Sequence, residues 1–367
     1  MSLLSFRPGQ VGGAETYVRQ LVSHLPQVAA GDQLLLIVDR DVAGRLPAPG
    51  WECVVFPVGA RAVVAQRILE AYTPFRARDL ERRLAGLRAD VLFFPQQSIF
   101  PARVEQPAVV SVGDVQHVVL PENFGLFDRT FRKRVYPRSM HSARHLIAVS
   151  QFTRTMLLER CGIAAEKVTA IPHGIDPLDG ELPAIAPTGL VQGPYLYYPA
   201  ATYPHKGHET LLLTYAALRK RGALAERLVF SGLRTRLWYA RLVPLARELG
   251  IENDLAHVGS VPYDELRRLF LGASAIVFPT TFEGFGIPVL EAAQLRKRVI
   301  TSRLEVFDEI GVPRRSQIDF SDPQAFLTAL RETGPLVLEK PPITWRDCAE
   351  RTLPVLRRAA SPGFNTH

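Results

Sequence analysis

The chain has 367 residues, which is enough for two domains of ordinary size, each with its own hydrophobic core. Its 47% hydrophobic and 22% charged residues are typical of a soluble globular protein, and no apolar run approaches the roughly 20 residues of a membrane span. The net charge of +8 comes from arginines spread along the chain without an aromatic-interleaved nucleic-acid motif, so we expect no nucleic-acid partner.

The first half of the chain alternates short apolar runs with helical patterns. Helices are expected at 16–25 and about 62–88, and strands at 2–6, 33–38, 52–56, 91–94, 108–112, 145–149 and 168–171. This alternation predicts a parallel sheet covered by helices on both faces. Residues 179–194 are rich in Pro, Gly and Ala and lack periodicity, so a domain boundary is expected there.

The second half of the chain repeats the alternation. Helices are expected at about 207–220, 236–249, 263–271, 288–295 and 323–331, and strands at 195–198, 227–231, 256–258, 275–278 and 298–301. The doubled pattern predicts an α/β protein with two Rossmann-like domains at about 1–180 and 190–340. A last helix is expected at about 344–360.

The stretch EGFGIPVLE, from Glu283 to Glu291, is the most informative part of the chain. It follows an apolar strand, and Pro288 suits the first position of a helix because its missing N–H costs nothing there. Gly284 and Gly286 let the backbone approach a ligand closely, while the helix start offers N–H groups to an anion. The glutamates, one on the loop and one in the first helical turn, add carboxylates that accept hydrogen bonds from hydroxyl groups. A nucleotide sugar carries both a diphosphate and such hydroxyls, so it fits this combination.

Two glutamates with seven residues between them, around a G-x-G-x-P core, resemble the signature of retaining GT-B glycosyltransferases of family 4. The resemblance implies two Rossmann-like domains facing across a cleft, with an acceptor bound by the first, a nucleotide-sugar donor bound by the second, and a final helix that crosses back to the first. It implies that Glu283 binds donor-sugar hydroxyls in the catalytic centre and that Glu291 binds the ribose. It also implies donor contacts from the residues between them: Gly284, Phe285, Gly286 and Ile287.

Other glycines match motifs of the same family. Gly12 and Gly13 match its G-G-x-E motif, in which glycine amides meet the donor diphosphate from the first domain; an ordinary strand-to-helix turn is the alternative. In the second domain, Gly232 matches a small-residue strand end that lets the donor lie close. Val261 lies in a G-x-V loop whose main chain reads the nucleobase. Because main-chain contacts carry no side-chain code, this loop does not identify the base.

Lys206 follows the first strand of the second domain, at a strand end where such sheets bind ligands. It matches the family lysine whose ammonium neutralises the donor diphosphate, and a surface lysine is the alternative. Related enzymes often carry an arginine six residues earlier, where this chain has Ala200. Lys206 then carries more of the diphosphate charge, or a neighbouring arginine substitutes.

The segment DVQH, which begins at Asp114, and the following PENF resemble a mannosyltransferase-like subgroup of the family. Asp114 and His117 are therefore candidate catalytic residues, with a helix cap and a structural histidine as the respective alternatives. Many relatives carry a histidine near the donor sugar where this chain has Gly113. Further along, Ser150 is expected to cap a helix, and His173 is expected to be structural.

The resemblance implies transfer of a sugar from a nucleotide diphosphate sugar, with GDP-mannose favoured, to an acceptor hydroxyl with retention at the anomeric carbon. Front-face attack, assisted by the departing phosphate oxygen, needs no dedicated general base. The chain has no D-x-D acidic cluster, so no metal or other cofactor is expected. The acceptor, a glycan, a lipid-linked molecule or a small molecule, is expected to contact first-domain loops around 57–75, 96–105 and 120–140.

Three other functions are compatible with parts of this pattern. An impaired GT-B protein that binds a nucleotide sugar without transferring it is suggested by Gly113 and Ala200. A nucleotide-sugar epimerase of GT-B fold is the second. A nicotinamide-dependent enzyme is disfavoured, because no G-x-G-x-x-G motif is followed by an acidic residue about 20 positions later.

Cysteine usage and charge predict where the protein works. Three widely spaced cysteines, Cys53, Cys161 and Cys348, argue against a disulfide framework or a zinc site. With no visible signal peptide, they predict a cytoplasmic protein. Two denser basic segments, 76–83 and 132–138, suggest peripheral contact with the inner face of the cell membrane. The acceptor, the pathway and the oligomeric state are left open.

Overall fold

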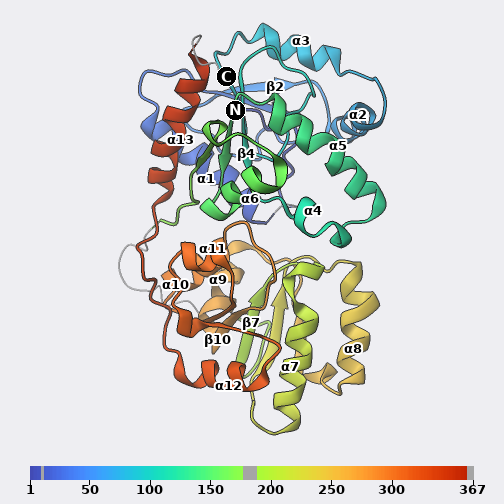
Figure 1. Cartoon of the computed structure of the whole chain (residues 1–367), viewed down its shortest axis with the longest axis vertical. Coiled ribbons are helices and arrows are strands. Elements are labelled where there is room, and N and C mark those ends of the chain that lie inside the picture. The colour runs from blue at the N-terminus through green and yellow to red at the C-terminus, as the bar shows by residue number, and fades with distance from the viewer. Residues whose placement is uncertain (10–11, 177–187, 362–367) are drawn as a thin grey trace. The chain divides into compact units, whose positions relative to one another are not determined.

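The chain forms two compact units, each described here by itself (Figure 1). The computed structural model describes the following residues: 1–9, 12–176 and 188–361. Residues 179–187 of the expected domain boundary lie outside this part of the chain. The first unit comprises Met1–Asp176 and Ile343–His367, and the second comprises Pro177–Pro342. Both contain parallel strands covered by helices, so the predicted α/β class is confirmed.

The strands of the first unit form a four-stranded sheet of order β3-β4-β5-β6 and a two-stranded sheet that pairs β1 with β2, all parallel. Their bounds are β1 (Leu35–Asp39), β2 (Glu52–Phe56), β3 (Leu92–Phe94), β4 (Ala108–Val112), β5 (His145–Ala148) and β6 (Val168–Ala170). The N-terminal residues connect the two sheets: Ser2 N–H donates to the Phe93 carbonyl and Leu3 N–H to the Ile37 carbonyl, both at 2.8 Å. The strand expected at 2–6 is wrong, because the chain turns after this single bridge.

The helices of the first unit differ from the expected ones chiefly at α2, α3 and α5. Their bounds are α1 (Gly13–Val28), α2 (Ala60–Tyr72), α3 (Arg78–Gly86), α4 (Gln116–Val119), α5 (Leu126–Ser142), α6 (Gln151–Cys161) and α13 (Trp345–Ala360), with short 3-10 turns η1 (Pro121–Asn123) and η2 (Ala165–Lys167). The single helix expected at 62–88 is α2 and α3, separated where Pro74 offers no N–H to a continuing helix. A helix, α5, fills most of the segment 120–140 that was expected to be a loop.

The C-terminal helix α13 packs along α1 within the first unit (Figure 1). A capping box between Thr344 and Asp347 starts this helix. At the first residue of α13, the centroid of the Trp345 ring lies 6.4 Å from that of the Tyr17 ring and 5.6 Å from that of the His173 ring. His173 is therefore part of the packing that fixes α13 to the first unit.

The second unit contains one six-stranded parallel sheet of order β12-β11-β10-β7-β8-β9. Its strands are β7 (Tyr195–Pro199), β8 (Arg227–Ser231), β9 (Leu255–His257), β10 (Ala275–Phe278), β11 (Val299–Ser302) and the unpredicted two-residue β12 (Gln317–Ile318). The chain runs from β7 outward through β8 and β9, then returns to β10 on the other side of β7. The junction of β7 and β10 is thus the switch point at which open parallel sheets bind ligands.

Helices lie on both sides of this sheet, with α7 and α8 to the right of β7 in Figure 1 and α9 and α10 to the left. Their bounds are α7 (His208–Lys220), α8 (Val243–Glu248), α9 (Tyr263–Gly272), α10 (Ile287–Gln294), α11 (Glu305–Glu309) and α12 (Pro323–Glu332), with short turns η3 (Pro204–Lys206), η4 (Trp238–Leu242, a π-turn), η5 (Glu252–Asp254) and η6 (Arg314–Ser316). Along the residues described, no helix combines the length and apolar character needed to cross a bilayer.

Candidate active site

The loops that follow β7 and β10 lie directly against each other. Gly207, which ends the turn after β7, has a positive φ of 67°. A Cβ atom at this position would lie 2.0 Å from the Pro279 carbonyl oxygen, just after β10. Two further bonds tie the loops together, since Thr281 N–H donates to the His205 carbonyl at 2.7 Å and Thr280 Oγ1 donates to it at 3.1 Å. The close approach therefore requires glycine at 207.

This approach brings together two residues that the sequence placed on separate motifs. The Lys206 ammonium lies 2.6 Å from Glu283 Oε1, and the two side chains are 20% and 18% exposed. The Lys206 carbonyl in turn accepts a hydrogen bond from the Tyr198 hydroxyl at 2.8 Å. A cation and a carboxylate thus share one position at the switch point of the sheet. A diphosphate that approaches Lys206 has to share or replace Glu283 as its partner.

The start of α10 follows Glu283 at the same edge of the sheet. Gly286 is the N-cap with a φ of 114°, and a Cβ atom there would come within 3.1 Å of the Phe307 ring. The Phe285 and Ile287 side chains are 6% and 8% exposed. These two side chains serve packing, so a donor contact at either position would come from the main chain, as it would at Gly284, which has no side chain.

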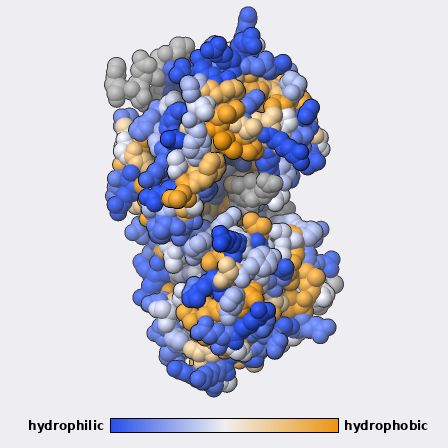
Figure 2. Space-filling view, turned by 90° about the vertical axis from the view of Figure 1, so that its right-hand side faces the viewer, coloured by the Kyte–Doolittle hydropathy of each residue, from blue (hydrophilic) through white to orange (hydrophobic). Residues whose placement is uncertain are grey.

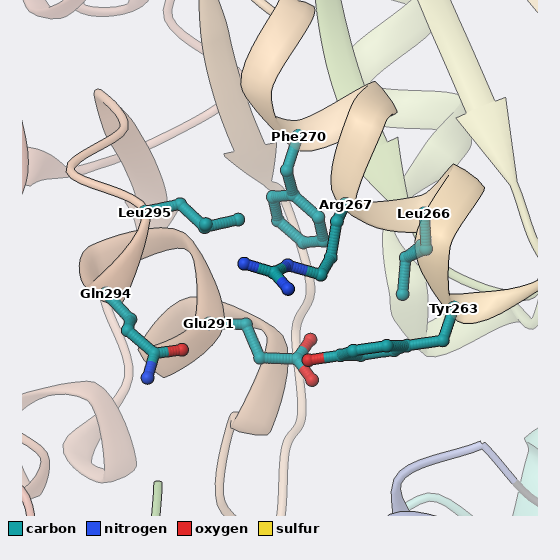
Figure 3. A pocket seen from close by; sticks show the side chains of 7 residues that line it. All are labelled: Tyr263, Leu266, Arg267, Phe270, Glu291, Gln294 and Leu295. Atoms are coloured by element: carbon teal, nitrogen blue, oxygen red, sulfur yellow. The ribbon is translucent and has the colours of Figure 1, made fainter. Parts of the chain in front are cut away.

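Glu291 lies one turn further along α10, as its fifth residue, rather than in the first turn as expected. It lines a small pocket between α9 and α10 (Figure 3) with six other residues: Tyr263, Leu266, Arg267, Phe270, Gln294 and Leu295. Burial raises the pKa of the Glu291 carboxyl to about 7. The carboxylate accepts no hydrogen bond from the residues that the structure describes, so its oxygens are available to a ligand.

The same pocket contains polar residues that sequence reasoning missed. Figure 3 shows the Tyr263 hydroxyl directed towards the Glu291 carboxylate and the Arg267 guanidinium beside the Phe270 ring. Arg267 Nη2 is buried and has no hydrogen-bond partner within the described residues. Tyr263 and Arg267 are four residues apart on α9 and so share one helix face, which is the signal that would have found them.

Gly232 and Val261 lie at the neighbouring strand ends. Gly232 follows β8 with a φ of 107°, and a Cβ atom there would lie 2.9 Å from the Ala201 main-chain nitrogen. Its N–H donates to the Gly259 carbonyl at 2.8 Å, which joins the end of β8 to the loop after β9. Val261, on that loop, is half-buried. Gly232 and Val261, which were expected to contact the donor, therefore lie on loops at one edge of the second unit's sheet.

In the first unit, the glycine motif forms the start of α1. Gly12 is the N-cap with a φ of 50°, and α1 begins at Gly13, three residues earlier than expected. Glu15, in the first turn, accepts a hydrogen bond from Gly9 N–H at 2.5 Å and pairs with Arg19 at 2.8 Å. The two glycines are exposed. The motif thus builds an accessible helix start, as the glycine pattern predicts.

Asp114 and His117 lie on the loop and helix that follow β4. Asp114 Oδ1 accepts a hydrogen bond from Gln116 N–H at 2.9 Å, a local turn cap. Gln97, which has a positive φ of 52°, accepts from Gly113 N–H at 2.9 Å and donates to the Asp114 carbonyl. The His117 ring is 3% exposed and meets Tyr136 edge-on at 4.9 Å. Burial lowers the pKa of His117 to about 4, so its imidazole is neutral.

Two remaining expectations concern caps and metal sites. Ser150 accepts a hydrogen bond from Thr153 N–H at 2.9 Å at the start of α6, so the predicted cap is confirmed. Within the described ranges, no three His, Cys, Asp or Glu side chains gather in an arrangement that holds a metal ion. Lys206, Arg267 and helix N–H groups contribute positive charge in this part of the second unit.

Comparison with known protein families gives two matches that together cover most of the chain. The model of Glycosyltransferase Family 4 matches residues 11–177. The model of Glycosyl transferases group 1 matches residues 187–333.

Curated relatives are distant and only partly covered. The O-antigen chain mannosyltransferase B of Escherichia coli is 25% identical over 252 residues, which are 66% of this chain and 65% of that protein. The O-antigen chain mannosyltransferase RfbU of Salmonella typhimurium is 21% identical over 226 residues, or 60% of this chain and 59% of that protein. The matched segments span less than two thirds of either relative.

Solved structures match along nearly the whole chain. The structure of Anabaena HepE in complex with UDP and glucose has a TM-score of 0.62 at 17% identity and covers 96% of this chain and 97% of its own. The structure of WaaG, a glycosyltransferase involved in lipopolysaccharide biosynthesis, has a TM-score of 0.62 at 16% identity, with 98% and 97% covered. These likenesses confirm the predicted GT-B architecture.

Proposed function

The chain belongs to the group 1 and family 4 glycosyltransferases, and from this membership we propose that it transfers a sugar from a nucleotide diphosphate sugar to an acceptor hydroxyl. The proposed reaction retains the configuration at the anomeric carbon and uses no metal ion. The observation that carries this proposal is the pair of Lys206 and Glu283 at the switch point of the second unit's sheet. The two residues are 77 positions apart in the sequence, so the motif matches alone do not show that they are in contact.

Lys206 and Glu283 carry opposite charges and act on different parts of the donor, the diphosphate and the sugar. As the bond between the anomeric carbon and the diphosphate oxygen breaks, negative charge grows on the diphosphate. The Lys206 ammonium and the N–H groups at the start of α10 stabilise that charge. Glu283, released from the ammonium, accepts hydrogen bonds from hydroxyls of the donor sugar. When Lys206 exchanges Glu283 for the diphosphate, its ammonium stabilises the negative charge that develops on the leaving group.

The pocket beside α10 fits the nucleoside end of the same donor. Glu291 offers a carboxylate to ribose hydroxyls, and Arg267 offers a buried guanidinium nitrogen without a partner among the described residues. Tyr263, which is 59% exposed, offers a ring face at the mouth of the pocket. The unused hydrogen-bonding groups of this pocket support a polar ligand there rather than simple packing.

The favoured donor is GDP-mannose, because both O-antigen relatives are mannosyltransferases by name. HepE, a neighbour in fold, was solved with UDP and glucose. UDP-glucose is therefore the donor to compare first.

The test measures nucleotide release from GDP-mannose and UDP-glucose, without and with magnesium, first in the absence of acceptor and then with glycan, lipid-linked and small-molecule acceptors. We expect magnesium-independent release that rises with a suitable acceptor, and a product whose anomeric proton shows retention by NMR. Release that is absent with both donors, or a product of inverted configuration, would contradict the proposal. A changed sugar without acceptor would instead identify an epimerase.

An impaired nucleotide-sugar binder is the second candidate, favoured by Gly113 and Ala200. Among the described residues, a Cβ atom at Gly113 would approach Gln97 Oε1 at 3.7 Å, an ordinary contact distance, so the backbone there accepts a Cβ atom. If the wild-type chain binds donor without turnover, Gly113→His is expected to create measurable turnover. If wild-type turnover is present and Gly113→His changes it little, the chain works without that histidine.

A further inference from the structure

Arg67, on α2 in the first unit, is a half-buried cation with no anionic partner in the part of the chain that the structure describes. Its Nη2 donates to the Ser98 hydroxyl at 3.0 Å, and its guanidinium carbon lies 5.7 Å from the centre of the Phe131 ring. Among the residues that the structure describes, it forms no ion pair with a carboxylate. A guanidinium that is partly removed from water without a compensating anion loses part of its hydration, which costs free energy.

The neighbouring charges are already paired and add to the positive field. Arg7 pairs with Asp39 at 2.8 Å, and Arg132 pairs with Asp128 at 2.9 Å. Burial, followed by the nearby charges of Arg7 and Arg132, lowers the pKa of Arg67. Each of these arginines except Arg67 thus has its own carboxylate.

Glu70, one helical turn after Arg67, does not fill this gap. Its carboxylate accepts hydrogen bonds from Ala77 N–H at 3.2 Å and Ala102 N–H at 3.0 Å. These bonds hold the loops after α2 and β3 in place, so the carboxylate serves the fold.

Arg67 is also where three separate chain segments meet. It comes from segment 57–75, Ser98 comes from 96–105, and Phe131 comes from 120–140, which are the segments expected to contact the acceptor. Tyr136, on the same helix as Phe131, accepts a hydrogen bond from Arg132 at 3.2 Å and keeps its own hydroxyl proton for another partner. Tyr136 also interacts electrostatically with Arg67, so Arg67, Ser98 and Tyr136 form one cluster of hydrogen-bond donors.

We propose that Arg67 binds a phosphate group of the acceptor, with the Ser98 and Tyr136 hydroxyls as further donors. A guanidinium is planar and presents paired N–H groups that match two phosphate oxygens. The inference rests on the proposed function only in calling the ligand an acceptor; the phosphate site itself stands on the first unit alone.

The surface around Arg67 indicates two sources for such a phosphate. On the face that carries α2 and α5, hydrophobic residues gather in patches bordered by hydrophilic ones (Figure 2). The exposed apolar side chains of these helices and of α4 are Val64, Leu69, Val118, Val119, Leu126 and Phe127. A soluble sugar phosphate would use Arg67 alone, whereas a lipid-linked phosphate would also contact this apolar surface.

The test uses the full chain carrying Lys206→Ala, which removes the cation expected to bind phosphate in the second unit. Calorimetry with mannose 1-phosphate, and with mannose as the neutral control, compares this chain with versions that also carry Arg67→Gln or Arg67→Lys. We expect binding that needs the phosphate, a loss of about tenfold or more with Gln, and incomplete rescue by Lys. The matched control is Arg61→Gln, an exposed arginine on the same helix, which should change nothing.

A second arm identifies the source of the phosphate. Flotation with vesicles of phosphatidylcholine, alone or mixed with phosphatidic acid, is repeated with the same variants. Binding to the acidic vesicles that Arg67→Gln weakens and Arg61→Gln does not would assign a lipid-linked phosphate. If neither mannose 1-phosphate nor acidic vesicles depend on Arg67, the proposal is overturned.

A stability measurement keeps misfolding from confusing the result. Because Arg67 pairs with no carboxylate of the described residues, Arg67→Met should unfold at the same denaturant concentration as the wild type or a higher one. A clear loss of stability would mean that the charge is compensated within the fold, which would also overturn the proposal. Donor binding by the second unit is measured separately. A failure to bind donor would count against the proposed function but not against the phosphate site at Arg67.

Discussion

The two units hold their key cations in opposite ways. In the second unit, Lys206 is paired with Glu283, and both residues belong to recognisable motifs. In the first unit, Arg67 touches no carboxylate among the described residues and belongs to no motif. Under the two proposals, the donor site exchanges one anion for another, whereas the first-unit site gains its first anion when a ligand binds. Five predictions test this contrast, beginning with the largest effect.

The largest effect is expected from removing the paired cation. Lys206→Ala should lower donor turnover by about 100- to 1000-fold, the range typical of losing one group that stabilises developing negative charge. Nucleotide release measured at saturating donor checks this result. The matched control is Lys220→Ala, an exposed lysine at the end of α7, which should leave turnover unchanged. Equal turnover in both variants would remove Lys206 from the mechanism.

The next effect concerns the glycine that allows the pair to form. Gly207→Ala should destabilise the chain by about 3 kcal/mol, because a Cβ atom would collide with the Pro279 carbonyl in addition to the strain of a positive φ. Gly222→Ala has a similar φ of 64° with nothing within 4 Å, so it should cost only about 1 kcal/mol. Urea unfolding of the two variants measures the difference. Equal costs would mean that the two loops are not in contact.

A smaller effect is expected from the proton on Glu291. The folded chain raises the pKa of this carboxyl from 4.5 to about 7, so the folded state holds the proton more tightly than the unfolded state. Stability therefore falls as pH rises between these values, and Glu291→Gln should be more stable than the wild type by about 1–3 kcal/mol near pH 8. Near pH 4.5 the two should be alike. Urea unfolding of the wild type and of Glu291→Gln at both pH values measures this difference in stability.

The raised pKa of Glu291 also leads to a prediction about ligand binding. If ribose hydroxyls donate to Glu291, binding favours the carboxylate and releases a proton below about pH 7. Calorimetry in buffers of different ionisation enthalpy should detect this proton with the wild type and not with Glu291→Gln. The same proton release in both proteins would place the ribose elsewhere.

The smallest effect is expected at His117. Because burial lowers the pKa of this histidine to about 4, it stays neutral at ordinary pH. His117→Gln should leave the shape of the pH profile of donor turnover unchanged between about pH 6 and 8. A wild-type step in this range that the variant lacks would show that His117 takes part in proton transfer.

Much of the fold could be predicted from local patterns. The bounds of β4, β8 and β10 agree with the predicted ones, because each is a short apolar run between polar residues or turns. The helix α5 was missed because its basic residues and Pro137 obscure the apolar period. Such a helix is held by neighbours that only the tertiary structure supplies.

The site was predicted to different depths in the two units. Backbone-dependent motifs identified Lys206 and Glu283 separately, and their contact follows only from the placement of β10 beside β7. Arg67 could not be singled out, because only the packing of distant segments leaves it beside Ser98 without a carboxylate partner among the described residues. Arg267 was missed for the same reason.

The most direct test of the central claim is a calorimetric titration of the chain with GDP, UDP, ADP and dTDP without magnesium, repeated with Lys206→Ala and Lys220→Ala. We expect that one nucleotide binds clearly better than the others. Lys206→Ala should weaken the binding of that nucleotide by about tenfold or more, and Lys220→Ala should have no effect. Binding of none of the four, or binding that is indifferent to Lys206, would contradict the assignment of the donor site.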